Sequence, residues 1–153
     1  MRLAALIAPA LGALVPLSAA ADGIEIHAPF ALISPAGQSG AAFMRIENTG
    51  PADDRLIAAR ADIAERVELH THLIDDIGTM RMMEVEEGFP IPAGGSYLLE
   101  RGGDHVMFLG LREAPEPGAE IPLTLVFESG AELTLQVPVE SPMGHGHGHS
   151  HGH

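Results

Sequence analysis

The chain contains no cysteine among its 153 residues. It therefore cannot form a disulfide bond or a thiolate metal site, and this argues against a blue-copper electron carrier, which needs a cysteine ligand. Methionine and histidine remain as soft and borderline metal ligands, and the chain has 7 methionines and 9 histidines. Because thioether and imidazole ligands together favour Cu(I) over Zn(II) or Ca²⁺, copper is the first metal that the composition indicates.

Basic side chains are also scarce, and all of them are arginine. The chain has 8 basic against 21 acidic residues, which gives a formal net charge of -13. So large an acidic excess argues against nucleic acid or anionic lipid as a partner. It favours solubility or a basic protein as the binding partner.

Recognisable catalytic groupings are missing from the sequence. It shows no Ser/His/Asp arrangement, no phosphate-binding loop and no carboxylate pair in a context that would support chemistry. We therefore expect a binding protein and no enzyme.

The first 21 residues have the layout of a secretory signal peptide. Arg2 is followed by a short apolar run and by small residues that offer cleavage after Ala20 or Ala21. Pro9 and Pro16 interrupt the apolar run, which is short for a membrane span. We expect export to the periplasm, a single folded domain over 22–140 without stable membrane insertion, and a flexible tail over 141–153.

The mature chain is predicted to be all-β. No segment has the periodicity of a long amphipathic helix, and 61–67 is long enough for one helical turn at most. The segment 86–95 is expected to be a loop, and Ser129 and Gly130 are expected at a hairpin turn. Many short strands in one small domain predict a β-sandwich or Greek-key barrel. Apolar alternation between turn residues predicts strands at 24–30, 41–50, 54–60, 66–73, 80–85, 96–100, 105–111, 121–130 and 131–139.

Strand alternation places histidine and methionine side chains away from the apolar core. Successive side chains point to opposite faces, so His70 and His72 oppose Val67 and Leu69. His105 and Met107 likewise oppose Val106 and Phe108, and Met80 and Met82 oppose Met83 and Val85. Met44 and Met83 are expected to fill the core, and His27 is expected at the surface. The candidate metal ligands on one face are His70, Met80, His105 and Met107.

Several segments resemble the PCu(A)C periplasmic copper chaperone family. They are RVELHTH at 66–72, MRMMEV at 80–85, IPAGGSYLL at 91–99, GGDHVMFLGL at 102–111 and IPLTLVFESG at 121–130, and the likeness extends over most of 24–139. The resemblance implies a cupredoxin-like β-barrel that carries Cu(I) at a solvent-facing site of His and Met side chains. It also implies a copper acceptor protein as partner, either a cytochrome c oxidase subunit or another assembly chaperone.

The family pattern leaves two registers open. It consists of a His or Met, ten residues, a Met, twenty-one residues and then His-x-Met, and His105-x-Met107 matches its end. By count, His72 and Met83 fill the first two positions. By sequence landmarks, His70 and Met80 fill them, with a shorter hairpin and a longer following loop, which loops tolerate. Strand alternation favours His70 and Met80, with Met82 and His72 as nearby reserves.

The tail adds five histidines that alternate with small residues. Such a segment is too poor in apolar residues to fold, and its imidazoles suit Cu(II) or Zn(II). An engineered tag is the alternative, although tags are usually uninterrupted histidine runs. The tail leaves open an alternative function: a periplasmic copper store or copper-resistance protein that does not deliver copper to a specific acceptor. Its candidate Cu(II) ligands are His145, His147, His149, His151 and His153.

Overall fold

The structure is a computed structural model that describes residues 23–142. The predicted signal peptide at 1–21 and the five tail histidines at 145–153 lie outside the described residues.

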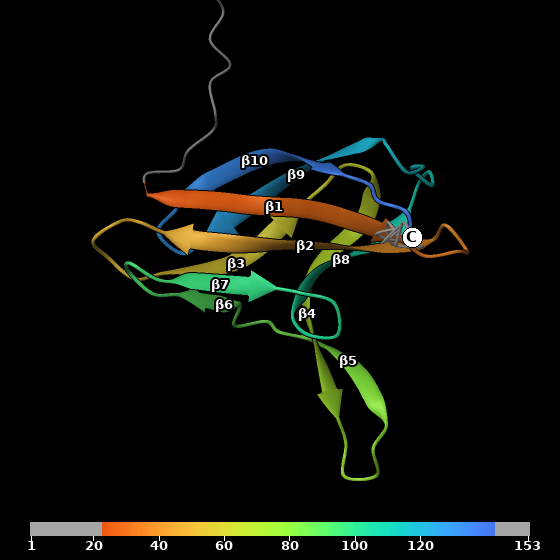
Figure 1. Ribbon diagram of the computed structural model, residues 1–153, viewed down its shortest axis with the longest axis horizontal. Helices are drawn as coiled ribbons and strands as arrows, with labels where there is room; N and C mark the ends of the chain where they lie inside the picture. The colour runs from red at the N-terminus through yellow and green to blue at the C-terminus, as the bar shows by residue number, and fades with distance from the viewer. Residues whose placement is uncertain (1–22, 143–153) are drawn as a thin grey trace, which may run out of the picture.

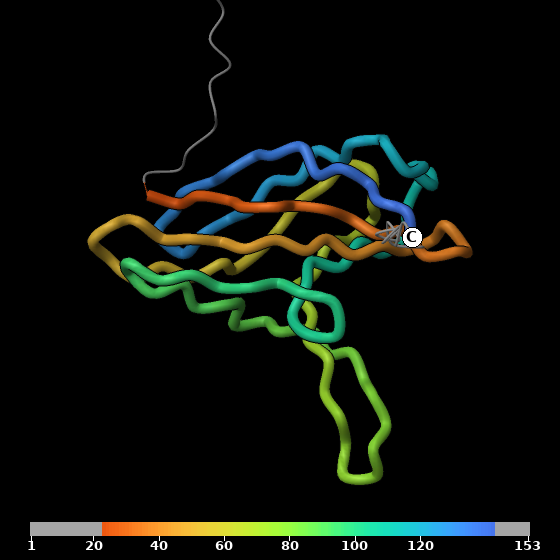
Figure 2. Tube along the Cα trace, in the orientation of Figure 1, coloured from red at the N-terminus to blue at the C-terminus, as the bar shows by residue number. Residues whose placement is uncertain are grey.

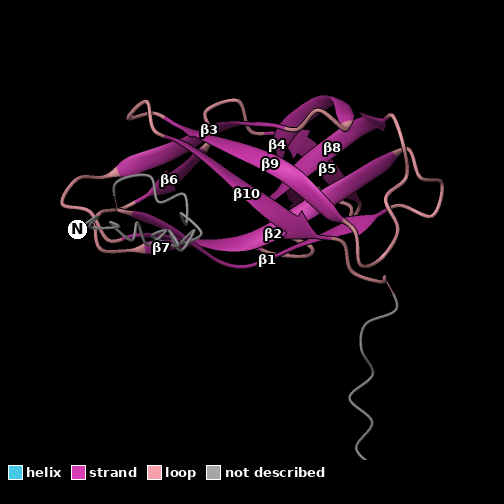
Figure 3. Ribbon diagram, turned by 90° about the horizontal axis from the view of Figure 1, so that it is seen from above, coloured by secondary structure: helices cyan, strands magenta, loops and turns pink. Residues whose placement is uncertain are grey.

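Two antiparallel sheets make up the described chain, which confirms the all-β prediction (Figures 1 and 3). The six-stranded sheet has the order β1-β2-β8-β4-β5, with β7 also paired to β2, and the four-stranded sheet has the order β10-β9-β3-β6. Within residues 23–142 there is no helix, and therefore none long and apolar enough to cross a membrane. The strands are β1 (Ile24–Ile33), β2 (Ser39–Asn48), β3 (Asp54–Arg60), β4 (Ala64–Ile74), β5 (Met80–Glu84), β6 (Phe89–Ile91), β7 (Ser96–Leu99), β8 (His105–Leu111), β9 (Glu120–Phe127) and β10 (Glu132–Pro138).

The apolar core joins the inner faces of the two sheets. Every second side chain of β9 is buried, as expected for a strand with one face in the core. The same cluster takes buried side chains from the other sheet, among them Val106, Phe108 and Met44. Met44 is a core residue, as predicted. Burial of these apolar side chains drives the packing of one sheet on the other.

The two sheets are also linked at one edge. Ala31 of β1 forms an isolated parallel bridge with Val139, just after β10, and the N–H of Glu140 donates to the carbonyl of Ala31 at 2.9 Å. This bridge partly closes the sandwich, as expected of a cupredoxin-like β fold.

One segment differs from its predicted state. The predicted loop at 86–95 contains β6, a three-residue edge strand whose central Pro90 needs no ladder hydrogen bond on its open side. The segment 61–67 forms no helix, in agreement with the prediction: a tight turn leads into β4 at Ala64. Just before β6, the backbone of Gly88 lies so close to β3 that no side chain fits. A Cβ at Gly88 would lie 2.0 Å from the carbonyl oxygen of Leu56.

The hairpin of β4 and β5 projects beyond the sandwich (Figures 1 and 2). The edge strand β5 pairs with β4 alone, and all five of its residues are exposed. The end of β4 and the turn add exposed Leu73, Ile74 and Ile77. The hairpin therefore offers apolar side chains to solvent, next to the face that carries the predicted metal ligands.

Candidate metal site

The pairing of β4 with its two neighbours places the predicted ligands on one outer face. Across β4 and β8, His70 lies opposite His105 and Glu68 lies opposite Met107. Across the hairpin, His72 lies opposite Met82. Directly opposed residues of paired strands share a face, so these side chains stand together on the face opposite the core.

His105 is the centre of an imidazole cluster. Its ring centroid lies 5.1 Å from that of His72, 5.9 Å from that of His70 and 6.1 Å from that of Phe43. These neighbours cover it so completely that His105 is only 2% exposed, although it points away from the core. Three imidazoles from two adjacent strands are thus neighbours on the outer face of the sheet.

Burial lowers the pKa of His105, and the nearby His72 and His70 lower it further. The hydrogen bond to the Gly103 carbonyl and the charge of Asp104 act in the opposite direction without cancelling the effect. His105 is therefore held neutral at neutral pH. Only a neutral imidazole has the free lone pair that a metal ion needs.

One backbone carbonyl orients two of the three imidazoles. The carbonyl oxygen of Gly103 accepts hydrogen bonds from Nδ1 of His105 at 3.0 Å and from Nδ1 of His72 at 3.2 Å. Since a carbonyl oxygen only accepts, the proton of each neutral ring is on Nδ1, and Nε2 carries the lone pair. Hydrogen bonds of this kind fix the tautomer and the orientation of histidine ligands in metal sites.

The loop that carries Gly103 is braced by Tyr97. The Tyr97 hydroxyl donates a short hydrogen bond to the carboxylate of Asp104, and the Tyr97 ring stacks on Phe89 with centroids 5.2 Å apart. Burial and the contact with Asp104 raise the pKa of Tyr97 to about 12, so the phenol stays protonated and keeps donating. The brace fixes the turn between β7 and β8 and, through Gly103, the two imidazoles.

His70 is held differently. Its Nε2 lies 2.8 Å from a carboxylate oxygen of Glu68, whose other oxygen accepts a hydrogen bond from Arg66 at 2.6 Å. The Nδ1 atom of His70 is buried and has no hydrogen-bond partner in the described chain. A buried polar atom without a partner is uncommon and is a candidate for a role with a ligand.

A small cavity on this face brings together four of the candidate ligands. It measures ≈ 260 Å³ and is lined by Leu32, Ile33, Ser34, Ser39, Gly40, Ala41, Phe43, His72, Met82, His105 and Met107. No carboxylate is among the lining residues. Two thioethers and two imidazoles therefore meet in an otherwise largely apolar hollow.

The structure separates Met80 from this group. Met80 lies opposite Ile74, two pairs nearer the hairpin tip than the His72 and Met82 pair and four pairs beyond His70. At about 3.4 Å per residue, four positions correspond to roughly 14 Å along the strands. Met80 is therefore not brought together with His105 and Met107, whereas the reserve residues His72 and Met82 are.

Met83 is not brought to the cavity either. It lies opposite Thr71, on the other face of the hairpin from Met82. It is 51% exposed and so does not fill the core as expected, because the hairpin has left the sandwich at this point.

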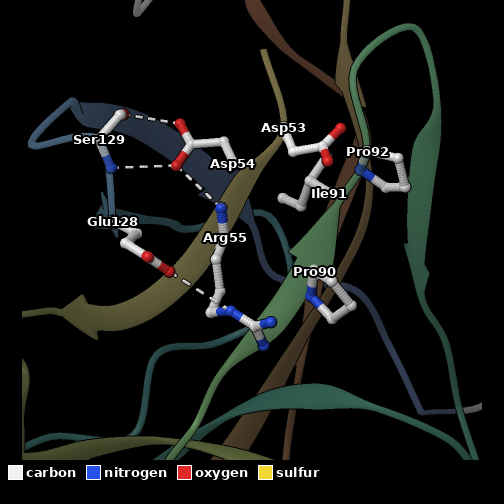
Figure 4. Close-up of a pocket in the computed structure, with 8 residues that line it drawn as sticks. All are labelled: Asp53, Asp54, Arg55, Pro90, Ile91, Pro92, Glu128 and Ser129. Atoms are coloured by element: carbon white, nitrogen blue, oxygen red, sulfur yellow. Dashed lines mark hydrogen bonds and ion pairs between the residues drawn. The ribbon is translucent and has the colours of Figure 1, made fainter.

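A second hollow, at the start of β3, has its polar groups engaged in structural contacts (Figure 4). Asp54 accepts hydrogen bonds from the backbone N–H of Arg55 at 2.8 Å and from the Ser129 hydroxyl at 2.7 Å. Burial raises the pKa of Asp54, but these bonds, with one from the backbone of Ser129, lower it overall. Asp54 thus ties β3 to the turn after β9 and has a structural role.

Comparison with known proteins gives a consistent match. The family model described as "Putative lipoprotein LpqE-like" matches residues 24–139. A curated relative, "Putative lipoprotein Lxx21020" of Leifsonia xyli subsp. xyli (strain CTCB07), is 33% identical over 120 residues, which cover 78% of this chain and 71% of the relative.

Similar solved structures are PCuAC domains and related copper proteins. The copper-bound PCuAC domain from PmoF2 has a TM-score of 0.64 at 23% identity, over 78% of this chain and 94% of that one. The solution structure of CuI-DR1885 from Deinococcus radiodurans has a TM-score of 0.60 at 26% identity, over 82% and 85% of the two chains. The apo form of DR1885 has a TM-score of 0.61 at 25% identity, over 94% and 95%.

Proposed function

The chain belongs to the LpqE-like family, which is the PCuAC family, and we propose that it binds one Cu(I) ion and delivers it to an acceptor protein. One observation carries this proposal: His72, Met82, His105 and Met107 line the same small cavity on the outer face of the six-stranded sheet.

These four side chains are the proposed Cu(I) ligands. His105 and Met107 come from the His-x-Met motif, and the hairpin supplies His72 and Met82 in place of the His70 and Met80 favoured by the sequence. The reason is register, because Met82 rather than Met80 lies opposite a histidine of β4. His70 is not among the residues that line the cavity, although its ring centroid lies 5.9 Å from that of His105.

The chemistry of the ligand set supports Cu(I). All four donors are neutral when the imidazoles are unprotonated, and two of them are soft thioether sulfurs. The cavity offers Zn(II) two imidazoles but no carboxylate or thiolate, and thioether sulfur is a poor ligand for Zn(II).

Delivery is supported by the exposure of the hairpin. Met82 is 48% exposed, so an acceptor's ligand can approach the copper from the hairpin side. The neighbouring Ile74 and Ile77 are 71% and 85% exposed, and clustered exposed apolar side chains often mark a protein contact. The acidic excess of the chain favours a basic surface on that partner. A cytochrome c oxidase subunit or another chaperone of its copper centre is the proposed acceptor.

We also propose export to the periplasm, with residues 1–21 as a signal peptide, 22–140 as the copper domain and 141–153 as a tail that binds Cu(II). Copper handling outside the cytoplasm fits the methionine and histidine ligand set, which does not depend on a reduced thiol.

A copper store is the second candidate, favoured by the five tail histidines. The two functions are separated by transfer from the Cu(I)-loaded protein to the apo form of a copper-site domain of cytochrome c oxidase, followed by the optical absorption of the filled acceptor site. A chaperone transfers its copper faster than the same amount of free Cu(I) chelate does. A store transfers it no faster, and that result would refute delivery.

A further inference from the structure

A second group of ligand atoms lies on the outer face of the same sheet, on β1 and β2. We propose that Glu25, His27 and Glu47 form a binding site for a divalent transition-metal cation, distinct from the Cu(I) site. Zn(II) and Cu(II) are the cations that suit it and serve as its probes.

The three side chains lie close enough together to hold one metal ion. One ligand atom from each lies within 4.8 Å of the other two. Nε2 of His27 is 2.9 Å from a carboxylate oxygen of Glu47 and 3.6 Å from one of Glu25. A cation between these atoms needs only small side-chain rotations to reach bonding distances of about 2.0–2.2 Å.

Strand pairing holds the group together. Glu25 lies directly opposite Glu47 in the β1 and β2 ladder, and His27 is two residues from Glu25 on the same face. The backbones of two hydrogen-bonded strands therefore set the spacing of the three ligands. The register shifts after His27 at a bulge that brings Phe30 opposite Phe43.

Charge and hydrogen bonding leave room for a cation. Two carboxylates directly opposite each other repel, and the nearby positive charge is Arg45, whose guanidinium is 3.5 Å from Glu47. Nε2 of His27 is shielded from solvent. It lies 2.9 Å from a carboxylate oxygen of Glu47, but the two groups are not oriented for a hydrogen bond, and the described chain offers this nitrogen no other partner. A metal ion would give this nitrogen a partner and neutralise the carboxylates.

The site is separate from the Cu(I) cavity although both lie on one sheet face. The rings of Phe30 and Phe43, with centroids 5.1 Å apart, stand between them, and Phe43 in turn contacts His105. Glu47 is four residues beyond Phe43 on β2, or roughly 13 Å at about 3.3 Å per residue. No side chain can serve both sites.

The donor set also differs in kind. One imidazole and two carboxylates are borderline and hard donors, and with neutral His27 they carry two negative charges. Such a set favours Zn(II) or Cu(II) and disfavours Cu(I), the reverse of the preference expected at Met82 and Met107. The domain would then hold a soft monovalent ion and a harder divalent ion on one surface.

The test uses the full-length protein with the five tail histidines replaced by alanine, so that the tail cannot compete for metal. Zn(II) is titrated while side-chain ¹H–¹⁵N spectra follow each imidazole, and its affinity is measured against a chelator. One Zn(II) should shift the His27 ring, and Glu47→Gln should weaken binding at least about tenfold. Glu132→Gln is the matched control, because Glu132 is an exposed carboxylate paired with Arg60 at 2.9 Å on β10, in the other sheet.

Two further variants make the outcome decisive. His27→Gln should remove the single-imidazole coupling from the Cu(II) electron spin resonance spectrum and leave Cu(I) affinity unchanged. Arg45→Gln should strengthen Zn(II) binding, because it removes a competing positive charge. The proposal is overturned if Glu47→Gln binds Zn(II) as tightly as Glu132→Gln does, or if Zn(II) shifts only His70, His72 and His105.

Discussion

His72 lies directly opposite Met82 across the β4 and β5 hairpin. This pair brings one imidazole and one thioether to the rim of the cavity that His105 and Met107 line from β8. The copper proposal depends on this register, since a shift by one residue would turn the methionine to the other face.

Replacement of the hairpin methionines tests the register. Met82→Leu should lower Cu(I) affinity at least about tenfold, because it removes a ligand from the cavity while keeping a similar volume. Met83→Leu is the control on the opposite face and should leave the affinity unchanged, as should Met80→Leu nearer the tip. Competition with a chromophoric Cu(I) chelator measures all three. Loss in Met80→Leu with retention in Met82→Leu would instead support the set favoured by the sequence, His70 and Met80.

Tyr97→Phe tests the brace behind the imidazoles. The variant loses the hydrogen bond to Asp104 and should destabilise the fold by about 1 kcal/mol in urea unfolding. Because the loop carries Gly103, the variant should also weaken Cu(I) binding and mix the tautomers of His72 and His105 in ¹⁵N spectra. Unchanged tautomers and affinity would show that Tyr97 stabilises the loop without positioning the ligands.

The buried His105 predicts a pH-dependent stability in the absence of metal. Its pKa in the folded protein is below the ordinary 6.5, so the unfolded chain binds more protons at this site between the two values. The contribution to stability is complete above about pH 6.5 and declines as the pH falls toward the folded-state pKa. Urea unfolding of wild type and His105→Gln from pH 7.5 to 5 measures it. A His105 contribution that grows on acidification would contradict the assignment.

Asp54 predicts a second pH effect, at lower pH and unrelated to copper. Its pKa is lowered in the folded state, so its contribution to stability is complete above the unfolded value of about 3.8 and is lost as the pH falls through the folded value. Asp54→Asn should lower the free energy of unfolding at pH 7 by about 1–3 kcal/mol, because backbone and hydroxyl donors lose a charged acceptor. Its Cu(I) affinity should match that of the wild type. An unchanged unfolding free energy would mean that the hydrogen bonds with Ser129 contribute nothing measurable.

The sequence predicts the fold and the ligand-bearing strands well, because alternation of apolar residues is a local property. Met44 in the core and the outer-face positions of His105 and Met107 follow from that alternation. The strand β6 was missed because three residues around Pro90 carry no alternation signal.

Cross-strand partners are harder to predict, because pairing register depends on turn geometry and not on the strand alone. Alternation of side chains limits the choice of methionine ligand in the hairpin to Met80 or Met82. Only the pairing register shows that Met82 is the one opposite His72. For the same reason, the sequence does not predict the group of Glu25, His27 and Glu47. His27 comes close to Glu47 only through the pairing of β1 with β2. The burial of His105 likewise requires Phe43 and His72, which come from other strands.

Copper X-ray absorption of the protein loaded with one Cu(I) tests the central claim most directly, in the variant whose tail histidines are replaced. We predict two sulfur ligands, together with imidazole nitrogens, in the wild-type site. Met82→Leu should leave one sulfur ligand, and Met80→Leu should keep both. A Cu(I) site without sulfur, or one that loses a sulfur in Met80→Leu and none in Met82→Leu, would contradict the account.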